Sequence, residues 1–192
     1  VLLANESRLA DVVDILADAF HDDPIMQWIS PKSASLEYQR FAFNSTLPLF
    51  IHHGFSYITS DGTGAASWLP PGVPMPAAPV TLKNTLDNLK FGVGSIVRGL
   101  TTLYRMGKNH PTTPHYYLYA LGARASAQGK GIGTALIKQV LMQADQEGMP
   151  AYLENSKEKN LGFYQGHGFK VIKELKPTKT APTMWLMWRE PQ

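Results

Sequence analysis

Residues 128–133 read Gln128-Gly129-Lys130-Gly131-Ile132-Gly133 and lie between a predicted strand, Tyr116–Leu121, and a predicted amphipathic helix, Ile132–Gln146. The three glycines stand at alternate positions and lack the Cβ atoms that would hold a ligand away from the backbone. The helix that follows presents unpaired N–H groups and the positive end of its dipole. Glycines this dense cost roughly 1 kcal/mol each inside a helix, which a mere connecting turn would not require. The segment therefore predicts an anion site, with Lys130 adding charge at its rim.

Two common phosphate-binding motifs do not fit this segment. A Walker loop needs Ser or Thr after its Gly-Lys pair, whereas Lys130 is followed by Gly131. A dinucleotide fingerprint needs Gly or Ala where this chain has Thr134, although Glu154 stands about 20 residues on, as a ribose-binding acid would. The turn also begins too far beyond Leu121 for the tight first turn of a Rossmann unit. Another phosphate-bearing ligand is expected.

Two groups of residues carry a resemblance to a known family. Leu121-Gly122-Ala123, followed by the glycine turn, resembles motif A of the GCN5-related N-acetyltransferases. Motif B of that family is resembled by three later segments of this chain, Tyr152-Leu153-Glu154, Phe163-Tyr164 and Gly168-Phe169. The resemblance covers about His115 to Trp188, is only architectural from Asn5 to Leu69, and does not extend to residues 70–110.

The resemblance implies that acetyl-CoA is the co-substrate and binds where strands 116–121 and 151–154 part. The backbone of Leu121 and Ala123 would pair with pantetheine as an added strand does, and N–H groups of the turn would hold the pyrophosphate. The implied cofactor-binding residues are Leu121, Gly122, Ala123, Gln128, Gly129, Lys130, Gly131, Ile132, Gly133, Thr134, Asn155 and Asn160. Where the family often has a cofactor-binding Asn, this chain has Lys157. Asn155 and Asn160 flank it and either substitute for that Asn or cap the helix near residue 156.

The resemblance places Tyr164 at the general-acid position, where a phenol can donate a proton to the leaving thiolate. The alternative is a packed aromatic beside Phe163. The Leu121 N–H is a candidate oxyanion donor for the thioester carbonyl. Glu154 is the first candidate for the base, through a water, with a structural salt bridge as the alternative.

Three further side chains are weaker candidates. His115 is the second candidate base, with a surface histidine as the alternative. Asp22 and Asp23 lie in a segment that lines the acceptor entrance in this family, yet we favour turn chemistry for both. We expect the four tryptophans to belong to the core, namely Trp28, Trp68, Trp185 and Trp188.

The rest of the chain alternates helical and strand patterns. Helices are expected at Asn5–Phe20, from Ser33 or Ser35 to His53, at 81–107 as one or two helices, at Ile132–Gln146 and at Glu158–His167. Strands are expected at Phe55–Thr59, Ala65–Leu69, Tyr116–Leu121, Ala151–Glu154, Phe169–Leu175 and Thr183–Trp188. Asp22-Asp23-Pro24 is expected to break the chain, and the prolines from Pro70 to Pro79 to form a loop.

This order predicts an α/β fold, a three-layer α/β/α sandwich with a central mixed, mostly antiparallel sheet. A single domain is expected over residues 1–192. It would consist of N-terminal helices and a hairpin at 1–69, a loop and helical insertion at 70–110, and the acyl-CoA-binding and catalytic half at 111–192. The closing strand 183–188 is expected to be exposed and available for pairing across a homodimer; the alternative is a monomer.

Composition narrows the classes of function. The 192 residues include no cysteine, so disulfides, a cysteine nucleophile and thiolate metal sites are excluded, and no metal is expected. A net charge of +3 without a charge run does not favour nucleic acid. No membrane partner is expected, because no apolar run approaches the ~18–20 residues that span a bilayer. The start at Val1 suggests a trimmed chain without a targeting segment, in the cytoplasm.

The sequence thus predicts an N-acetyltransferase that moves an acetyl group from acetyl-CoA to a primary amine of a small molecule or peptide. The amine would attack directly in a ternary complex. The alternative is an acyl-CoA-binding module without turnover on the same fold.

Overall fold

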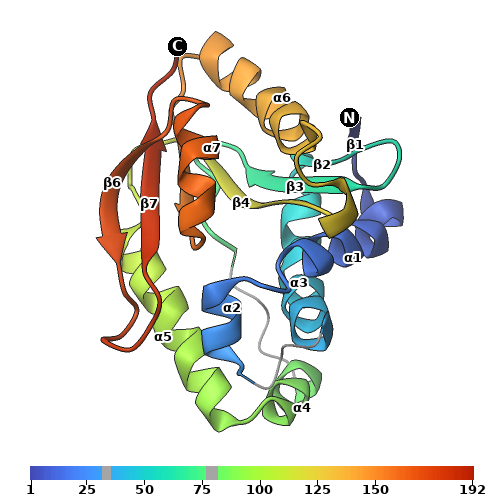
Figure 1. Ribbon diagram of the computed structural model, residues 1–192, viewed down its shortest axis with the longest axis vertical. Coiled ribbons are helices and arrows are strands. Elements are labelled where there is room, and N and C mark those ends of the chain that lie inside the picture. Colours follow the sequence, from blue (N-terminus) through green and yellow to red (C-terminus); the bar gives the residue numbers. More distant parts are fainter. Residues whose placement is uncertain (32–35, 77–81) are drawn as a thin grey trace.

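The computed structural model describes residues 1–31, 36–76 and 82–192 (Figure 1). Seven strands form one sheet in the order β1-β2-β3-β4-β5-β7-β6. Their bounds are Leu2–Leu3 (β1), Ser56–Ile58 (β2), Gly64–Leu69 (β3), Tyr116–Ala123 (β4), Ala151–Asn155 (β5), Lys170–Leu175 (β6) and Met184–Arg189 (β7). Neighbouring strands pair antiparallel except β4 and β5, which are parallel. The predicted mixed, mostly antiparallel sheet is confirmed.

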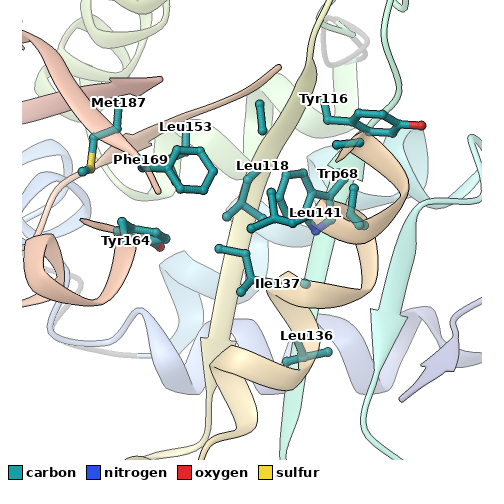
Figure 2. Close-up of a cluster of buried hydrophobic side chains, with 14 residues drawn as sticks. Trp68, Tyr116, Leu118, Leu136, Ile137, Leu141, Leu153, Tyr164, Phe169 and Met187 are labelled. Carbon is teal, nitrogen blue, oxygen red and sulfur yellow. The ribbon is translucent and has the colours of Figure 1, made fainter. Parts of the chain in front are cut away.

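Helices cover both faces of this sheet, which confirms the three layers. On one face lie α6 (Ile132–Gln146) and α7 (Leu161–Gln165). Leu136, Val140 and Ala144 follow one side of α6 and are buried, because the helical period places them on the face that meets the strands. Figure 2 shows Trp68 and Leu118 among the α6 side chains in this core.

The opposite face carries α1 (Leu9–Ala19), α2 (Pro24–Ile29), α3 (Leu36–Ile51) and α5 (Val93–Asn109), with α4 (Leu82–Lys90) beside α5. Val12 and Leu16 of α1 pack with Phe43 and Leu47 of α3 against Ala120 of β4. Short 3₁₀ segments precede α1 (Glu6–Arg8), follow β4 (Ala125–Ala127) and precede α7 (Glu158–Asn160).

β4 parts from β5 halfway along its length, and this opening positions the site. The two strands pair only from Tyr116 to Leu118 of β4. Against β3 the register skips from Ala120 to Leu118, so that Tyr119 is an extra residue in β4. A bulge of this kind bends a strand. The Tyr119 ring stacks on Phe50 with centroids 4.1 Å apart, and its hydroxyl lies 2.8 Å from Thr46 Oγ1. The predicted gap between the two strands is therefore present.

Several boundaries differ from the sequence-based expectation. Pro24–Ile29 forms α2, although Asp22-Asp23-Pro24 was expected to break the chain, because Asp23 caps the new helix and Pro24 occupies its first turn. The pattern at 81–107 resolves into two helices that separate at Gly92, whose φ of +89° is left-handed. Asn5 caps the first 3₁₀ turn as expected, whereas Ser33, Ser35 and Pro79 lie outside the described residues.

The expectation for the closing strand was wrong. β7 pairs with β5 on one side and with β6 on the other, so its backbone is occupied and cannot pair across a dimer. Local alternation predicted a strand at Thr183–Trp188, and the structure has it at Met184–Arg189, but alternation carries no information about the place of a strand in the sheet.

Candidate active site

A cleft of about 540 Å³ lies where β4 and β5 part. The glycine turn and the start of α6 form one wall, the loop after β5 and α7 another, and the α1–α2 corner a third. Eleven predicted cofactor-binding residues line it: Leu121, Gly122, Ala123, Gln128, Gly129, Gly131, Ile132, Gly133, Thr134, Asn155 and Asn160. The structure thus brings both sequence motifs into one cavity.

The glycines of the turn have two different physical roles. Gly129 (φ +76°) and Gly131 (φ +79°) adopt left-handed conformations, and a Cβ at either position would meet no atom within 4 Å. They are required by backbone conformation and leave open space in front of the chain. Gly133 instead faces the Phe163 ring, which an added Cβ would approach to 3.2 Å. This glycine allows α6 and α7 to approach closely.

The start of α6 is open to the cleft. Its N-cap is Gly131, which has no side chain to accept a hydrogen bond, and the N–H of Ala135 is the first to reach the Gly131 carbonyl, at 3.0 Å. The N–H groups of Ile132 to Thr134 therefore precede the helical ladder. Because these residues line the cleft, the positive end of the helix dipole lies at its wall.

Lys130 does not contribute to this wall. Its ammonium donates to the Ser126 carbonyl at 3.1 Å, and it is absent from the residues that line the cleft. The expected charge at the rim is therefore directed back onto its own loop. The anion site rests on main-chain N–H groups and the helix dipole instead.

The open edge of β4 also faces the cleft. The N–H of Arg124 donates to the Thr63 carbonyl beside β3 at 2.8 Å. Backbone groups alternate in direction along a strand, so the N–H groups of Leu121 and Ala123 point to the opposite side, where β5 has parted. The side chain of Gln128 donates to the Ala123 carbonyl at 3.3 Å on that side.

Asn155 and Lys157 organise the loop after β5. The Asn155 amide donates to the Lys157 carbonyl at 2.8 Å and accepts from the Lys157 N–H at 3.2 Å. Asn155 thus forms the turn, whereas the 3₁₀ segment and α7 that follow have no side-chain cap. The Lys157 ammonium donates to the Ala19 carbonyl at the end of α1, at 3.2 Å, and to the Asp22 carboxylate.

Tyr164 of α7 and Asp23, the N-cap of α2, both line the cleft. Asp23 is buried, with its carboxylate accepting from the Met26 N–H at 3.0 Å and from the Ser156 hydroxyl. Burial raises the pKa of this carboxyl, which the hydrogen bond from Ser156 partly offsets. Burial, and secondarily the Asp23 charge, raises the pKa of the Tyr164 phenol. Tyr164 therefore stays protonated over the neutral range.

The Glu154 side chain points away from the cleft, towards His110. It is only 3% exposed, and Oε1 lies 3.6 Å from His110 Nδ1. The residue lines the cleft through its main chain, which carries nearly all of its exposed surface. Its charge contributes to the raised pKa of Tyr152, of which burial is the larger cause. The pair with His110 has the geometry of the structural salt bridge that was the alternative for Glu154.

The rings of His110 and His115, beside Glu154, contact each other in a tilted arrangement with centroids 5.0 Å apart. His115 is buried, its Nδ1 lies 2.7 Å from the Thr113 carbonyl, and burial lowers its pKa. It does not line the cleft. His110 ends α5 in the segment that matched no motif, and no sequence signal marked it.

Other features of the described residues bear on the class of site. Among them, no group of three or more His, Cys, Asp and Glu side chains is arranged to hold a metal ion. No helix in the described ranges has both the length and the apolar character needed to cross a membrane. Trp68 is fully buried as expected, and Trp28, Trp185 and Trp188 pack against the core clusters.

Comparisons with known proteins agree with this geometry. Residues 92–169 match the family model described as the acetyltransferase (GNAT) family. An uncharacterised N-acetyltransferase of Schizosaccharomyces pombe is 26% identical over 92% of this chain and 77% of that protein. A crystal structure described as histone acetyltransferase HPA2 and related acetyltransferase from Corynebacterium glutamicum has a TM-score of 0.63 at 24% identity, covering 100% of this chain and 95% of that one.

Arylalkylamine N-acetyltransferase 2 of Aedes aegypti shares the fold with a TM-score of 0.65 at 14% identity, over 100% of this chain and 98% of that one. The motif order, the parted strands and these matches agree. Residues 92–169 carry the acetyltransferase (GNAT) family domain, and the chain is an acyltransferase.

Proposed function

We propose that the protein transfers an acetyl group from acetyl-CoA to a primary amine, by direct attack in a ternary complex. One observation carries the proposal: a single cleft joins the left-handed glycine turn, the open edge of β4 and the Tyr164 phenol. Its volume of about 540 Å³ is typical of a site for a small ligand.

The donor half of the cleft fits a pyrophosphate and its pantetheine arm. Main-chain N–H groups at the start of α6 would hold the pyrophosphate, and the space before Gly129 and Gly131 admits it. Leu121 and Ala123 would pair with the amides of the arm as a neighbouring strand would. Asn160 lines the same wall.

The chemical step requires one proton to be supplied and one to be removed. The amine nitrogen bonds to the thioester carbon, the carbon–sulfur bond breaks, and Tyr164 gives its proton to the departing thiolate. A raised pKa suits Tyr164 to this role, because the phenol remains protonated until it is used. The Leu121 N–H would polarise the thioester carbonyl.

Two carboxylates are candidates for the group that takes the amine proton. Glu154 would act through a water, for which its side chain must reach the cleft from beneath the sheet. Asp23 already lines the cleft and faces Tyr164. Glu154→Gln and Asp23→Asn separate the two, since only loss of the base flattens the rising limb of the pH–rate profile.

The acceptor is a small-molecule or peptide amine. Solved relatives of the same fold include an agmatine N-acetyltransferase (TM-score 0.61) and Chaetomium thermophilum Naa20 with a bisubstrate analogue (TM-score 0.56). Agmatine, an arylalkylamine and a peptide with a free N-terminus therefore form a first panel. The absence of cysteine suits a protein of the reducing cytoplasm. The protein would act as a monomer or a homodimer.

The test mixes protein, acetyl-CoA and each amine and follows the release of free thiol. Acetyl-CoA binding without thiol release across a broad amine panel would favour the non-catalytic binding module. Initial-rate lines for the two substrates should intersect, because the chain has no cysteine to carry an acyl group. Parallel lines would indicate a covalent acyl-enzyme and contradict direct attack.

A further inference from the structure

Helix α5 presents a small, polar face to the protein. Ser95 and Thr102 are buried, at 5% and 3% exposure. The Ser95 hydroxyl donates to the Phe91 carbonyl just before α5, and the Thr102 hydroxyl to the Arg98 carbonyl within it, each at 2.8 Å, so both have a partner. Between them Gly99 lies against α2, where an added Cβ would meet Ile29 at 3.8 Å. Small residues thus let α5 pack closely on α2.

The outer face of α5 is apolar. Val93, Val97, Leu100 and Tyr104 follow one side at intervals of four, three and four residues and are 56–66% exposed. Leu103 on α5 and two leucines of α4, Leu86 and Leu89, extend this surface. These seven residues are called the α4–α5 apolar face. Helices on a globular protein normally turn their apolar side inward, so an outward stripe of this extent indicates an interaction surface.

Charge distinguishes the kind of partner. Arg105 and Lys108 are exposed beside the stripe, and α5 contains no acidic residue between Val93 and Asn109. A second copy would pair with the same patch through a two-fold axis and would offer these cations no acidic partner on α5. An anionic surface instead satisfies the cations and the apolar stripe together.

We propose that the α4–α5 apolar face binds the surface of an anionic lipid membrane. Aliphatic residues, a tyrosine and flanking cations on one side of a helix are the pattern of helices that lie in the interface plane. In Figure 1 α5 runs along the outer edge of the molecule, with α4 at its end. The stripe would enter the headgroup boundary, and Arg105 and Lys108 would meet lipid phosphates. No residue of this face lines the catalytic cleft.

The absence of native cysteine makes a direct test clean. The full chain with Leu100→Cys, labelled with an environment-sensitive dye, is mixed with phosphatidylcholine vesicles with or without about 30% phosphatidylserine. Labelled Met142→Cys is the matched control, since Met142 is 62% exposed on α6, away from this face. The dye at position 100 should shift to the blue only with anionic vesicles, and the dye at 142 should not. No shift at 100, or equal shifts at both positions, would overturn the proposal.

Partitioning of unlabelled variants between buffer and vesicles provides a second measurement. Leu100→Asp should weaken vesicle binding on the order of tenfold by removing buried apolar area, and Met142→Asp should leave it unchanged. Arg105→Gln and Lys108→Gln should each weaken it about fivefold, and salt should reduce it. Circular dichroism verifies that each variant is folded. A dimer that Leu100→Asp dissociates, without vesicle binding by the parent chain, would assign the face to a second copy and overturn the proposal.

Discussion

The carboxylate of Asp23 accepts a hydrogen bond from the hydroxyl of Ser156, a residue 133 positions later in the chain. Next to this pair, Asp22 accepts from Lys157 and, at 3.2 Å, from Lys159. The α1–α2 corner is therefore bound to the loop after β5 by several side chains. Because both segments are walls of the cleft, these contacts set its shape.

The contacts of Asp22 predict a pH-dependent loss of stability in Asp22→Asn. Burial alone would raise the pKa of Asp22, but Lys157 and Lys159 lower it to about 2. The stabilisation is thus fully present above the ordinary pKa of about 4 and is lost as the pH falls through about 2. Urea unfolding at pH 7, 4 and 2.5 should show a difference between the two proteins that narrows towards acid.

The size of this effect is limited by solvent. The Asp22 side chain is 41% exposed, so we expect less than about 1 kcal/mol at pH 7. Raising the salt concentration should reduce the difference further, because an exposed pair is screened. A difference that is independent of pH would show that Asp22 stabilises the corner without its charge.

Gly131→Glu should abolish acetyl-CoA binding, because it places a side chain and a negative charge where the pyrophosphate is expected. Gly148→Glu is the matched control. Gly148 also has a positive φ, +64°, and also has open space around its absent Cβ, but it does not line the cleft. Both variants should lose similar stability from backbone strain. Calorimetric titration should show a loss of affinity only for Gly131→Glu, and unchanged affinity there would refute the assignment of the turn.

Tyr164→Phe should lower kcat by roughly 10²–10⁴-fold, the usual span for the loss of a general acid. Acetyl-CoA affinity should change little, since the ring keeps its packing against Phe163 and Phe169. Tyr57→Phe, outside the cleft, should leave kcat unaltered. A kcat within a factor of three of the parent enzyme would exclude Tyr164 as the acid.

The raised pKa of Tyr164 adds a pH signature. Since burial raises this pKa above the ordinary value of about 10, no loss of activity from Tyr164 ionisation should occur below that pH. Pre-steady-state rates between pH 7 and 10 measure this directly. A falling limb near pH 9 that disappears in Tyr164→Phe would contradict the raised pKa.

Asp145→Asn should destabilise the fold by about 2 kcal/mol. Asp145 of α6 binds the Arg189 guanidinium of β7 through two hydrogen bonds, at 2.6 and 2.8 Å, and Arg189 is only 4% exposed. The substitution leaves a buried cation without its counter-ion. Asp11→Asn removes an exposed ion pair with Arg8 and should cost less than about 1 kcal/mol. Equal losses in the free energy of unfolding of the two variants, measured by chemical denaturation, would mean that the burial of Arg189 does not strengthen its ion pair with Asp145.

Local patterns were sufficient for much of the fold. The spacing of Leu136, Val140 and Ala144 predicted α6 and its buried face, since helical period alone determines which side chains share a face. The alternate glycines predicted a turn with open space before it, because left-handed conformations are a property of single residues. The resemblance to the acetyltransferase motifs also implied that Tyr164 and the turn would share a cavity, and both line the cleft.

The tertiary structure alone decided where several side chains point. Glu154 was expected in the cleft, but its strand turns that side chain beneath the sheet towards His110, whose segment carried no motif. Lys130 turns back to Ser126, and β7 lies between β5 and β6. The positions of the Glu154 side chain and of β7 depend on contacts between residues distant in sequence, as does the bulge at Tyr119, where β4 parts from β5. Sequence periodicity determines which residues share a face, whereas long-range pairing determines what that face meets.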